Sequence, residues 1–151
     1  MLLLKKWIRF RWPVTIPHKL TIAELCDELG PGAQAAAAVN AVRFDTDGRL
    51  YGDNFDGHGF VAGLLGENPA DEAPDAIING KFILIIGAGG AARAIALSLS
   101  EQSVGRVDVM NRTHSRAEEA VNLVHRLRDD APVKALPAEQ VSFDSYDIVI
   151  N

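Results

Sequence analysis

Three small residues follow an apolar run in the middle of the chain, and their spacing could form a phosphate-binding turn. The run covers residues 81–86, and Gly87, Gly89 and Ala92 then match the pattern G-x-G-x-x-A. Gly87 permits a sharp turn, Gly89 lets the backbone approach a phosphate, and Ala92 allows a helix to pack closely on a strand. The free N–H groups at the start of that helix attract negative charge. We therefore predict a dinucleotide site at Gly87, Ala88, Gly89, Gly90 and Ala91.

The residues after the second expected strand indicate which dinucleotide would bind. A sheet that binds NAD normally carries an acidic residue about 20 residues beyond the glycines. Asn111 holds that position here, and Arg112, Thr113 and Arg116 come just after it. Arginine forms forked, charge-assisted hydrogen bonds with a phosphate, so the predicted cofactor is NADP(H). The alternative for the two arginines is a solvated helix start, and Asp108 is expected to be structural or capping.

The residues around the glycine turn predict alternating strands and helices. Beyond the first strand, the expected elements are a helix at 91–102, a strand at 106–111, a helix at 115–128, and strands at 133–136 and 146–150. This order, joined by right-handed crossovers, gives a doubly wound parallel sheet with the glycine turn at its C-terminal edge. Such a setting favours a dinucleotide turn over an ordinary strand-to-helix turn. The predicted fold class is α/β with a Rossmann-like parallel sheet, present here in part.

The beginning of the chain predicts a short strand followed by a helix. Residues 14–16 are β-prone, and Pro17 ends that run because proline cannot donate to a ladder. His18 and Lys19 follow at the end of the strand, where α/β proteins usually place their chemistry. Thr21 and Glu24 are spaced as a capping box for a helix that includes Leu29 and stops at Gly30.

The next stretch predicts a small helix, a hairpin and a second helix. The alanine-rich residues 33–38 suit a tightly packed helical turn. Residues 39–44 and 49–52 flank Asp47-Gly48, which is typical of a hairpin turn. A calcium loop is a poor alternative, because the aspartates lack the terminal glutamate of such a loop. A helix is expected over residues 61–65, ending near residue 66.

Composition places the chain among globular proteins. It has 151 residues, of which 48% are apolar and 23% charged, and its net charge of −5 gives no general attraction to nucleic acid or to anionic membranes. The first 20 residues nevertheless carry basic side chains and no acidic ones. No apolar run reaches the roughly 18 residues of a membrane span, and no signal peptide is recognisable. We expect a cytoplasmic protein in which Cys26, the single cysteine, is a structural thiol.

The acidic, proline-containing residues 67–76 are the best candidate for a linker. The expected organisation is therefore a first unit at 1–66, the linker, and a second unit at 77–151. His18 and His58 are interpreted as local polar contacts, because no spacing of acids or cysteines supports a metal site.

Four ordered motifs together resemble the shikimate dehydrogenase family. They are V-T-I-P-H-K at 14–19, A-V-N at 38–40 with G-D-N-F-D-G at 52–57, the glycine turn with N-R-T at 111–113, and D-I-V-I-N at 147–151. The resemblance runs from Val14 to the last residue. It implies that the first unit is part of a substrate-binding lobe and that the second is part of an NADP-binding domain.

The resemblance also implies an activity, the NADPH-dependent reduction of 3-dehydroshikimate to shikimate. By motif, Lys19 would be the catalytic lysine and Asp56 its acidic partner, while Thr15 and Asn40 would bind the substrate. Reduction of a carbonyl by hydride needs a proton for the developing alkoxide, which a lysine beside a carboxylate can supply. The structural alternatives are a surface lysine and a helix-capping aspartate.

Departures from the family pattern bear on substrate and completeness. Pro13 stands where the family usually has asparagine and Phe55 where it usually has threonine, so quinate or another cyclic polyol is a plausible substrate. By comparison with the family the chain is expected to be truncated at both ends, leaving exposed sheet edges that favour association, such as a homo-oligomer. A non-catalytic remnant or nucleotide-binding module is the alternative function.

Overall fold

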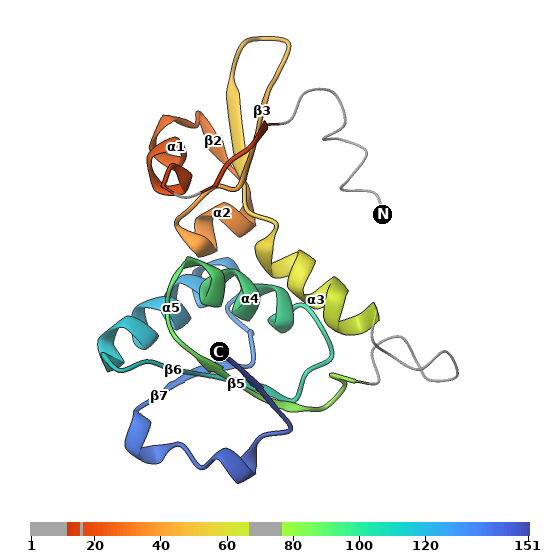
Figure 1. Cartoon of the computed structure of the whole chain (residues 1–151), viewed down its shortest axis with the longest axis vertical. Coiled ribbons are helices and arrows are strands. Elements are labelled where there is room, and N and C mark those ends of the chain that lie inside the picture. The colour runs from red at the N-terminus through yellow and green to blue at the C-terminus, as the bar shows by residue number, and fades with distance from the viewer. Residues whose placement is uncertain (1–11, 16, 67–76) are drawn as a thin grey trace.

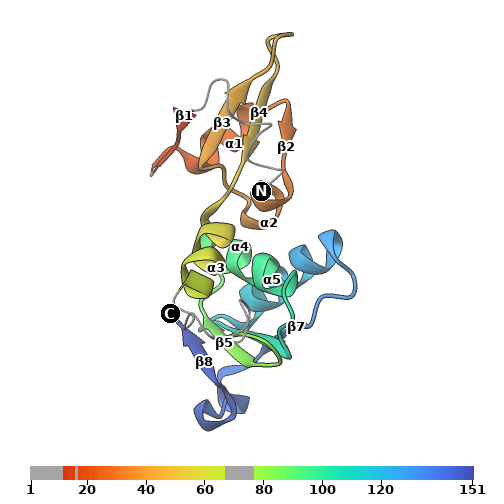
Figure 2. The ribbon, with the colours of Figure 1, turned by 90° about the vertical axis from the view of Figure 1, so that its right-hand side faces the viewer.

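The computed structural model describes residues 12–15, 17–66 and 77–151, and its two sheets lie one above the other along the long axis (Figure 1). The upper sheet is built from residues before 54, and the lower sheet from residues after 81. Helices lie between the two sheets in the perpendicular view of Figure 2. The basic first residues 1–11 and the proposed linker 67–76 lie outside the described residues.

The upper sheet has four strands in the order β1-β3-β4-β2, with β1 at Trp12–Pro13, β3 at Ala41–Phe44, β4 at Leu50–Asp53 and β2 at Glu28–Leu29. Strands β3 and β4 form the predicted antiparallel hairpin. Gly48 at its turn has φ +81°, a conformation that favours glycine. Helices α1 (Lys19–Leu25) and α2 (Pro31–Ala36) precede the hairpin, so the alanine-rich helix is confirmed as well.

Two predictions for the residues before the hairpin are wrong. The strand expected at 14–16 is β1, two residues earlier; the chain turns at Thr15, whose carbonyl accepts from the N–H of His18 at 2.9 Å. Val14 still donates its N–H to Asn40, at 2.8 Å, and Ile16 lies outside the described residues.

The helix expected from Thr21 to Leu29 is also misplaced. Helix α1 begins at Lys19 and His18 precedes it without a side-chain cap, so the predicted capping box is not formed. Leu29 lies in β2, which pairs in parallel with β4. Pairing of β2 with β4 is favoured over a longer helix because two hydrogen bonds flank it. The Asp27 carboxylate accepts the N–H of Leu50 at 2.7 Å, and the N–H of Gly30 donates to the carbonyl of Gly52 at 2.9 Å.

Cys26 lies between α1 and β2, half-buried, and donates its thiol hydrogen to the carbonyl of Ile22 at 3.1 Å. Burial, together with the nearby Asp27 carboxylate, raises the pKa of this thiol. A raised pKa lowers the thiolate fraction, so the side chain acts as the structural thiol that the sequence predicts.

The lower sheet is entirely parallel, in the order β7-β6-β5-β8, which confirms the predicted doubly wound sheet. Its strands are β5 (Phe82–Ile86), β6 (Arg106–Met110), β7 (Val133–Leu136) and β8 (Ile148–Ile150). Helices α4 (Gly90–Ser100) and α5 (His114–Leu127) cover one face, where Ile83, Ile85, Val107 and Val109 are buried. Two short 3₁₀ helices, at Ala138–Gln140 and Phe143–Ser145, connect β7 to β8.

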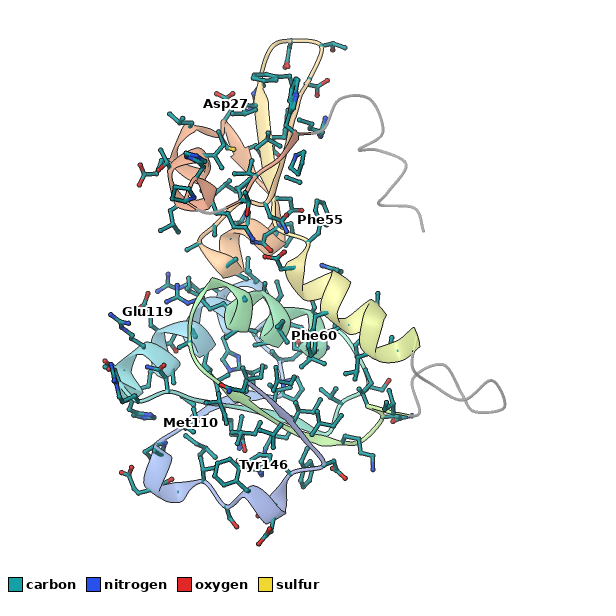
Figure 3. All side chains as sticks on the ribbon, in the orientation of Figure 1. Asp27, Phe55, Phe60, Met110, Glu119 and Tyr146 are labelled. Carbon is teal, nitrogen blue, oxygen red and sulfur yellow. The ribbon has the colours of Figure 1, made fainter. Side chains whose placement is uncertain are left out.

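Asp108 has the structural role expected for it. Its side chain is 1% exposed, accepts the hydroxyl hydrogen of Tyr146 at 2.8 Å, and forms an ion pair with Arg106 at 2.9 Å. Figure 3 shows Tyr146 on the side of the sheet away from α4 and α5. Burial, with the Asp108 carboxylate, raises the pKa of this tyrosine. The contact attaches the connection before β8 to the middle of the sheet.

Helix α3 (Asp56–Gly66) links the two parts and begins earlier than the sequence suggests. Gly57 on α3 lies so close to α4 that a Cβ there would be 2.1 Å from the carbonyl oxygen of Ala94. Gly90, at the start of α4, similarly faces Ala36 of α2, with its Cβ position 3.0 Å from that carbonyl oxygen. Small residues therefore allow α2 and α3 to lie directly on α4. None of the helices in the described ranges is long and apolar enough to cross a membrane.

We predict that Gly57→Ala lowers the free energy of unfolding by about 1–3 kcal/mol, because the added methyl group meets backbone that cannot yield. Gly63→Ala on the same helix is the matched control, since its Cβ would meet no atom within 4 Å. The control should raise stability by about 0.5–1 kcal/mol. Urea unfolding measures both variants, and equal effects at the two glycines would contradict the close contact.

A second prediction concerns Asp147, which attaches β8 to the start of β5. Its carboxylate accepts the N–H of Phe82 at 2.9 Å and a hydrogen from Lys81 at 3.1 Å. These two contacts lower its pKa below the ordinary value. The stabilising effect is complete above the unfolded-state pKa of about 4 and is lost as the pH falls through the lower folded-state value.

Unfolding by urea should therefore show a loss of stability below about pH 4 that is smaller in Asp147→Asn than in the wild type. Asp144→Asn is the control, because Asp144 forms no ion pair with the residues that the structure describes. The idea fails if both variants follow the pH dependence of the wild type.

Candidate active site and nucleotide turn

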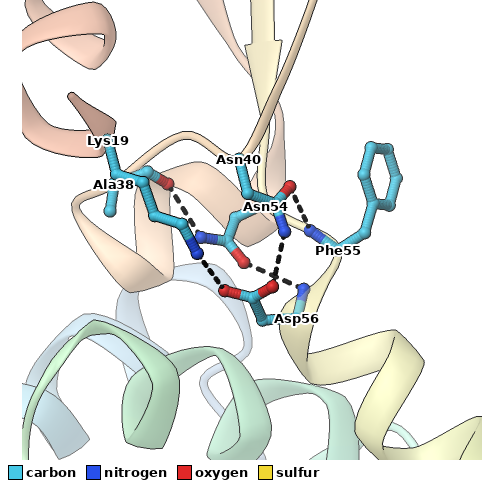
Figure 4. A network of polar contacts seen from close by, with 6 residues as sticks. All are labelled: Lys19, Ala38, Asn40, Asn54, Phe55 and Asp56. Carbon is cyan, nitrogen blue, oxygen red and sulfur yellow. Dashed lines mark hydrogen bonds and ion pairs between the residues drawn. The ribbon is translucent and has the colours of Figure 1, made fainter. Parts of the chain in front are cut away.

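Asp56 is the centre of a polar network that joins three separate segments (Figure 4). Its Oδ2 atom lies 2.9 Å from Nζ of Lys19, and its Oδ1 atom accepts from Nδ2 of Asn40 at 2.6 Å. Lys19 is the first residue of α1, Asn40 precedes β3, and Asp56 is the first residue of α3. The fold thus brings together three of the four side chains for which a catalytic or substrate-binding role is predicted.

Backbone contacts hold the three segments in register. The carbonyl of Lys19 accepts the N–H of Val39 at 2.9 Å, and the N–H of Asn40 donates to the carbonyl of Asp53 at 3.0 Å. Oδ1 of Asn40 also accepts the N–H of Phe55 at 3.0 Å. Asn40 therefore binds both the carboxylate and the backbone just before it, so its amide orientation is determined by its partners.

Asn54 stabilises the network through two contacts with the backbone. It is 3% exposed, donates from Nδ2 to the carbonyl of Ala38 at 3.1 Å, and accepts the N–H of Asp56 at 3.0 Å. The neighbouring Asp53 accepts the N–H groups of Ala33 and Asn54 through Oδ1, at 3.0 and 2.8 Å. Asp53 thereby caps α2, whose own N-cap residue, a glycine, has no side chain to do so.

The ion pair is accessible as well as organised. The side chain of Lys19 is 27% exposed and that of Asp56 is 40% exposed. An ammonium group has three hydrogens, and Asp56 is its one side-chain partner among the described residues. Lys19 can therefore give a hydrogen bond or a proton to a ligand while Asp56 keeps it in place.

Thr15, the fourth predicted residue, lies one turn before Lys19 and is exposed. Its hydroxyl has no hydrogen-bond partner within the described ranges. The two departures from the family pattern differ in placement. Pro13 lies in β1 and is exposed, and the Phe55 ring is directed away from the Asp56 carboxylate in Figure 4.

The residues of the predicted nucleotide turn form the connection between β5 and α4. Gly87 has φ +119°, which favours glycine, and its N–H is bonded to the carbonyl of Met110 at 2.7 Å. Within the described part of the chain, no acceptor is bonded to the N–H groups of residues 88–92. A Cβ on Gly89 would meet no atom within 4 Å, so open space adjoins this glycine. Unpaired donors facing open space at the start of a helix fit a phosphate group.

The residues predicted to bind a 2′-phosphate lie at the end of β6, beside the turn. Asn111 donates from Nδ2 to the carbonyl of Thr113 at 2.9 Å, and Thr113 precedes α5. Arg112 and Arg116 are exposed, and neither guanidinium has an ion-pair partner among the residues described. Both charges are thus available to a ligand, which fits the 2′-phosphate of NADP better than a bare ribose.

A short segment connects the two sites. Gly90 of the turn faces Ala38, whose Cβ lies 3.8 Å from the position of an added Cβ. The carbonyl of Ala38 binds Asn54, which in turn binds the N–H of Asp56. The nucleotide turn and the Lys19–Asp56 pair therefore lie on either side of residues 38–40.

Sequence reasoning missed Asn54 and Arg93. Asn54 belongs to the same motif as Asp56, but a buried asparagine has no periodic signal that would distinguish it from a turn residue. Arg93 lies in the first turns of α4 and donates to the carbonyl of Ala88 at 3.1 Å. A cation near a helix N-terminus opposes the helix dipole, and that unfavourable placement was the available signal. Groups of His, Cys, Asp or Glu suited to a metal ion are absent from the described residues.

Comparison with known proteins identifies the family. The family described as shikimate / quinate 5-dehydrogenase matches residues 71–151. The NADP⁺ shikimate dehydrogenase of Shewanella halifaxensis is 41% identical over 138 residues, which cover 91% of this chain and 46% of the relative. The chain belongs to the shikimate/quinate dehydrogenase family. It spans about half the length of the curated relatives that it matches.

Solved structures of family members share the fold. A quinate dehydrogenase from Corynebacterium glutamicum in complex with NAD superposes with a TM-score of 0.74 at 25% identity, covering 98% of this chain and 52% of that one. A shikimate 5-dehydrogenase from Thermus thermophilus, in complex with NADP(H) and shikimate, gives 0.64 at 32% identity, covering 90% and 46%. The Rossmann-like fold is thereby established for this chain.

We predict that Asn54→Ala lowers the free energy of unfolding by about 1–3 kcal/mol, because it leaves the carbonyl of Ala38 and the N–H of Asp56 without partners. Gln34→Ala is the matched control, since this amide makes one exposed bond, to Leu29 at 2.8 Å. Thermal and urea unfolding should separate the two variants clearly. Equal losses would mean that Asn54 does not support the network.

Proposed function

We propose that this chain provides the NADP-dependent dehydrogenase chemistry of its family, interconverting 3-dehydroshikimate and shikimate or a related cyclic polyol such as quinate. The observation that carries the proposal is the Lys19–Asp56–Asn40 network beside an open phosphate turn. A proton-transferring pair and a nucleotide turn are the two parts that such a reaction needs.

In the proposed mechanism, Lys19 acts on the oxygen of the reacting carbon. NADPH, when bound, supplies the hydride to the carbonyl carbon. The ammonium of Lys19 donates a hydrogen bond to the carbonyl oxygen, stabilises the developing alkoxide, and gives it a proton. The Asp56 carboxylate orients the ammonium and balances its charge, while Asn40 holds the carboxylate. In oxidation the neutral amine of Lys19 accepts the hydroxyl proton and becomes the ammonium again.

Asn40 and Thr15 are the proposed substrate contacts. The Thr15 hydroxyl is exposed on the same turn as Lys19, so it can bind a substrate hydroxyl without giving up a protein partner. Asn40 already binds Asp56 and Phe55, but each atom of its amide has further hydrogen-bonding capacity.

The proposed cofactor is NADP. We assign the pyrophosphate to the N–H groups of the turn formed by Gly87, Ala88, Gly89, Gly90 and Ala91. The 2′-phosphate is assigned to Arg112 and Arg116, with Asn111 and Thr113 beside the ribose. In this division, residues 1–66 contribute substrate contacts, residues 67–76 act as a linker, and residues 77–151 bind the cofactor.

A second candidate function is nucleotide binding without turnover. It needs only the open glycine turn and no proton transfer by Lys19. The two candidates predict the same cofactor affinity but opposite results in a turnover assay.

The decisive experiment is a dehydrogenase assay with shikimate and with quinate, each tested with NADP⁺ and NAD⁺. We predict that Lys19→Ala reduces turnover by at least about a hundredfold while NADP⁺ affinity changes less than about twofold, because Lys19 acts on the substrate oxygen. Lys134→Ala, an exposed lysine of β7, is the control and should retain full activity.

Two other outcomes decide against parts of the proposal. NADP⁺ binding without detectable turnover at high protein concentration favours the nucleotide-binding module. A parallel loss of turnover and NADP⁺ affinity in Lys19→Ala contradicts its assigned role in proton transfer.

A further inference from the structure

Arg93 makes contacts that the proposed dehydrogenase function does not use. The side chain is 14% exposed, and its Nε donates to the carbonyl of Ala88 at 3.1 Å. Its terminal nitrogen lies 3.3 Å from Glu119 on α5. One guanidinium therefore connects α4, the nucleotide turn and α5.

The position of this cation is unfavourable unless its contacts compensate. Arg93 lies one turn inside the N-terminus of α4, where the helix dipole repels positive charge. Removing most of a guanidinium from water also requires hydrogen-bonding partners. The Ala88 carbonyl and the Glu119 carboxylate supply them, which leaves Arg93 committed within the protein, unlike Arg112 and Arg116.

The hydrogen bond to Ala88 determines the orientation of a peptide group in the turn. The carbonyl of Ala88 and the N–H of Gly89 belong to the same peptide unit, and in a trans peptide they point in opposite directions. A carbonyl held on Arg93 therefore keeps the Gly89 N–H directed away from the guanidinium. Gly89 adjoins open space, and its N–H has no acceptor among the described residues.

The turn is thus held at two peptide groups, with one further peptide group between them. The N–H of Gly87 is bonded to Met110 of β6, and the carbonyl of Ala88 is bonded to Arg93 of α4. Between these points the turn contains Gly87 and Ala88, followed by Gly89. Glycines have the largest conformational freedom, so such a turn keeps a single shape only if its peptide groups are bonded.

We propose that Arg93 is a positioning residue that preorganises the nucleotide turn by binding the Ala88 carbonyl. Its role toward a cofactor rests on the proposed NADP site. Arg93 acts on the pyrophosphate region that NAD and NADP share, whereas Arg112 and Arg116 act on the 2′-phosphate that only NADP carries. This difference gives Arg93 a measurable signature.

The first test uses the free protein. In ¹H–¹⁵N spectra, Arg93→Met should shift or broaden the amide signals of residues 88–90, because the Ala88–Gly89 peptide is released. Signals from β7 and β8 should not change. Glu119→Gln is the control, since it weakens the ion pair but leaves the Ala88 bond. Arg93→Lys keeps the charge and one donor, and should give a smaller change at residues 88–90. It serves as the test variant if Arg93→Met folds poorly. Unchanged signals at 88–90 in both Arg93 variants would overturn the proposal.

The second test compares cofactors by titration followed with the same spectra. Arg93→Met should weaken NADP⁺ and NAD⁺ by the same factor, about tenfold for a lost hydrogen bond to a charged group. Arg116→Met should weaken NADP⁺ alone. If Arg93→Met loses affinity for NADP⁺ but not for NAD⁺, Arg93 contacts the 2′-phosphate, and the positioning role is overturned. A wild-type chain that binds neither nucleotide contradicts the proposed function, whereas the free-protein spectra still decide the role of Arg93.

Discussion

The close approach of α3 to α4 is the constraint on which both candidate sites depend. Gly57 follows Asp56 directly and lies against the backbone of Ala94, one helical turn from the start of α4. The carboxylate that holds Lys19 and the helix that begins at the nucleotide turn are therefore placed by the same contact. Backbone packed against backbone has few alternative positions, because no flexible side chain lies between to absorb a shift. This packing sets the distance between the Lys19–Asp56 pair and the glycine turn.

The lower sheet could be predicted well from sequence, for a physical reason. Strands buried on a parallel sheet are short continuous apolar runs, and glycine at positive φ marks the turn, so both leave local signals at 81–92. Lys19 also stands at the end of an expected strand, but the roles of Lys19, Asn40 and Asp56 are predicted only through motifs of the family. Nothing local in the sequence indicates that residues so far apart share hydrogen bonds, which arise when β3 and β4 pair.

Elements determined by long-range contacts were predicted poorly. Residues 28–29 carry a helical pattern, but their backbone pairs with β4, and the helix before them ends at Leu25. The Thr21–Glu24 spacing fits a capping box that the chain does not form, because α1 begins where Lys19 is bonded to Val39. Asn54 and Arg93 were missed because the Asn54 side chain binds backbone groups and Arg93 binds the backbone carbonyl of Ala88, and a sequence gives no sign of which backbone groups lie nearby.

The bond from Gly87 to Met110 has a consequence for how cofactor preference can change. Met110 is the last residue of β6, so the phosphate turn is attached to the sheet just before the segment 111–116 begins. In the proposed cofactor site, substitutions in that segment change the residues assigned to the adenosine ribose and leave the bond between Gly87 and Met110 in place. If the proposed site is right, the preference between NADP and NAD can change by substitution at 111–116 while the glycine turn keeps its shape.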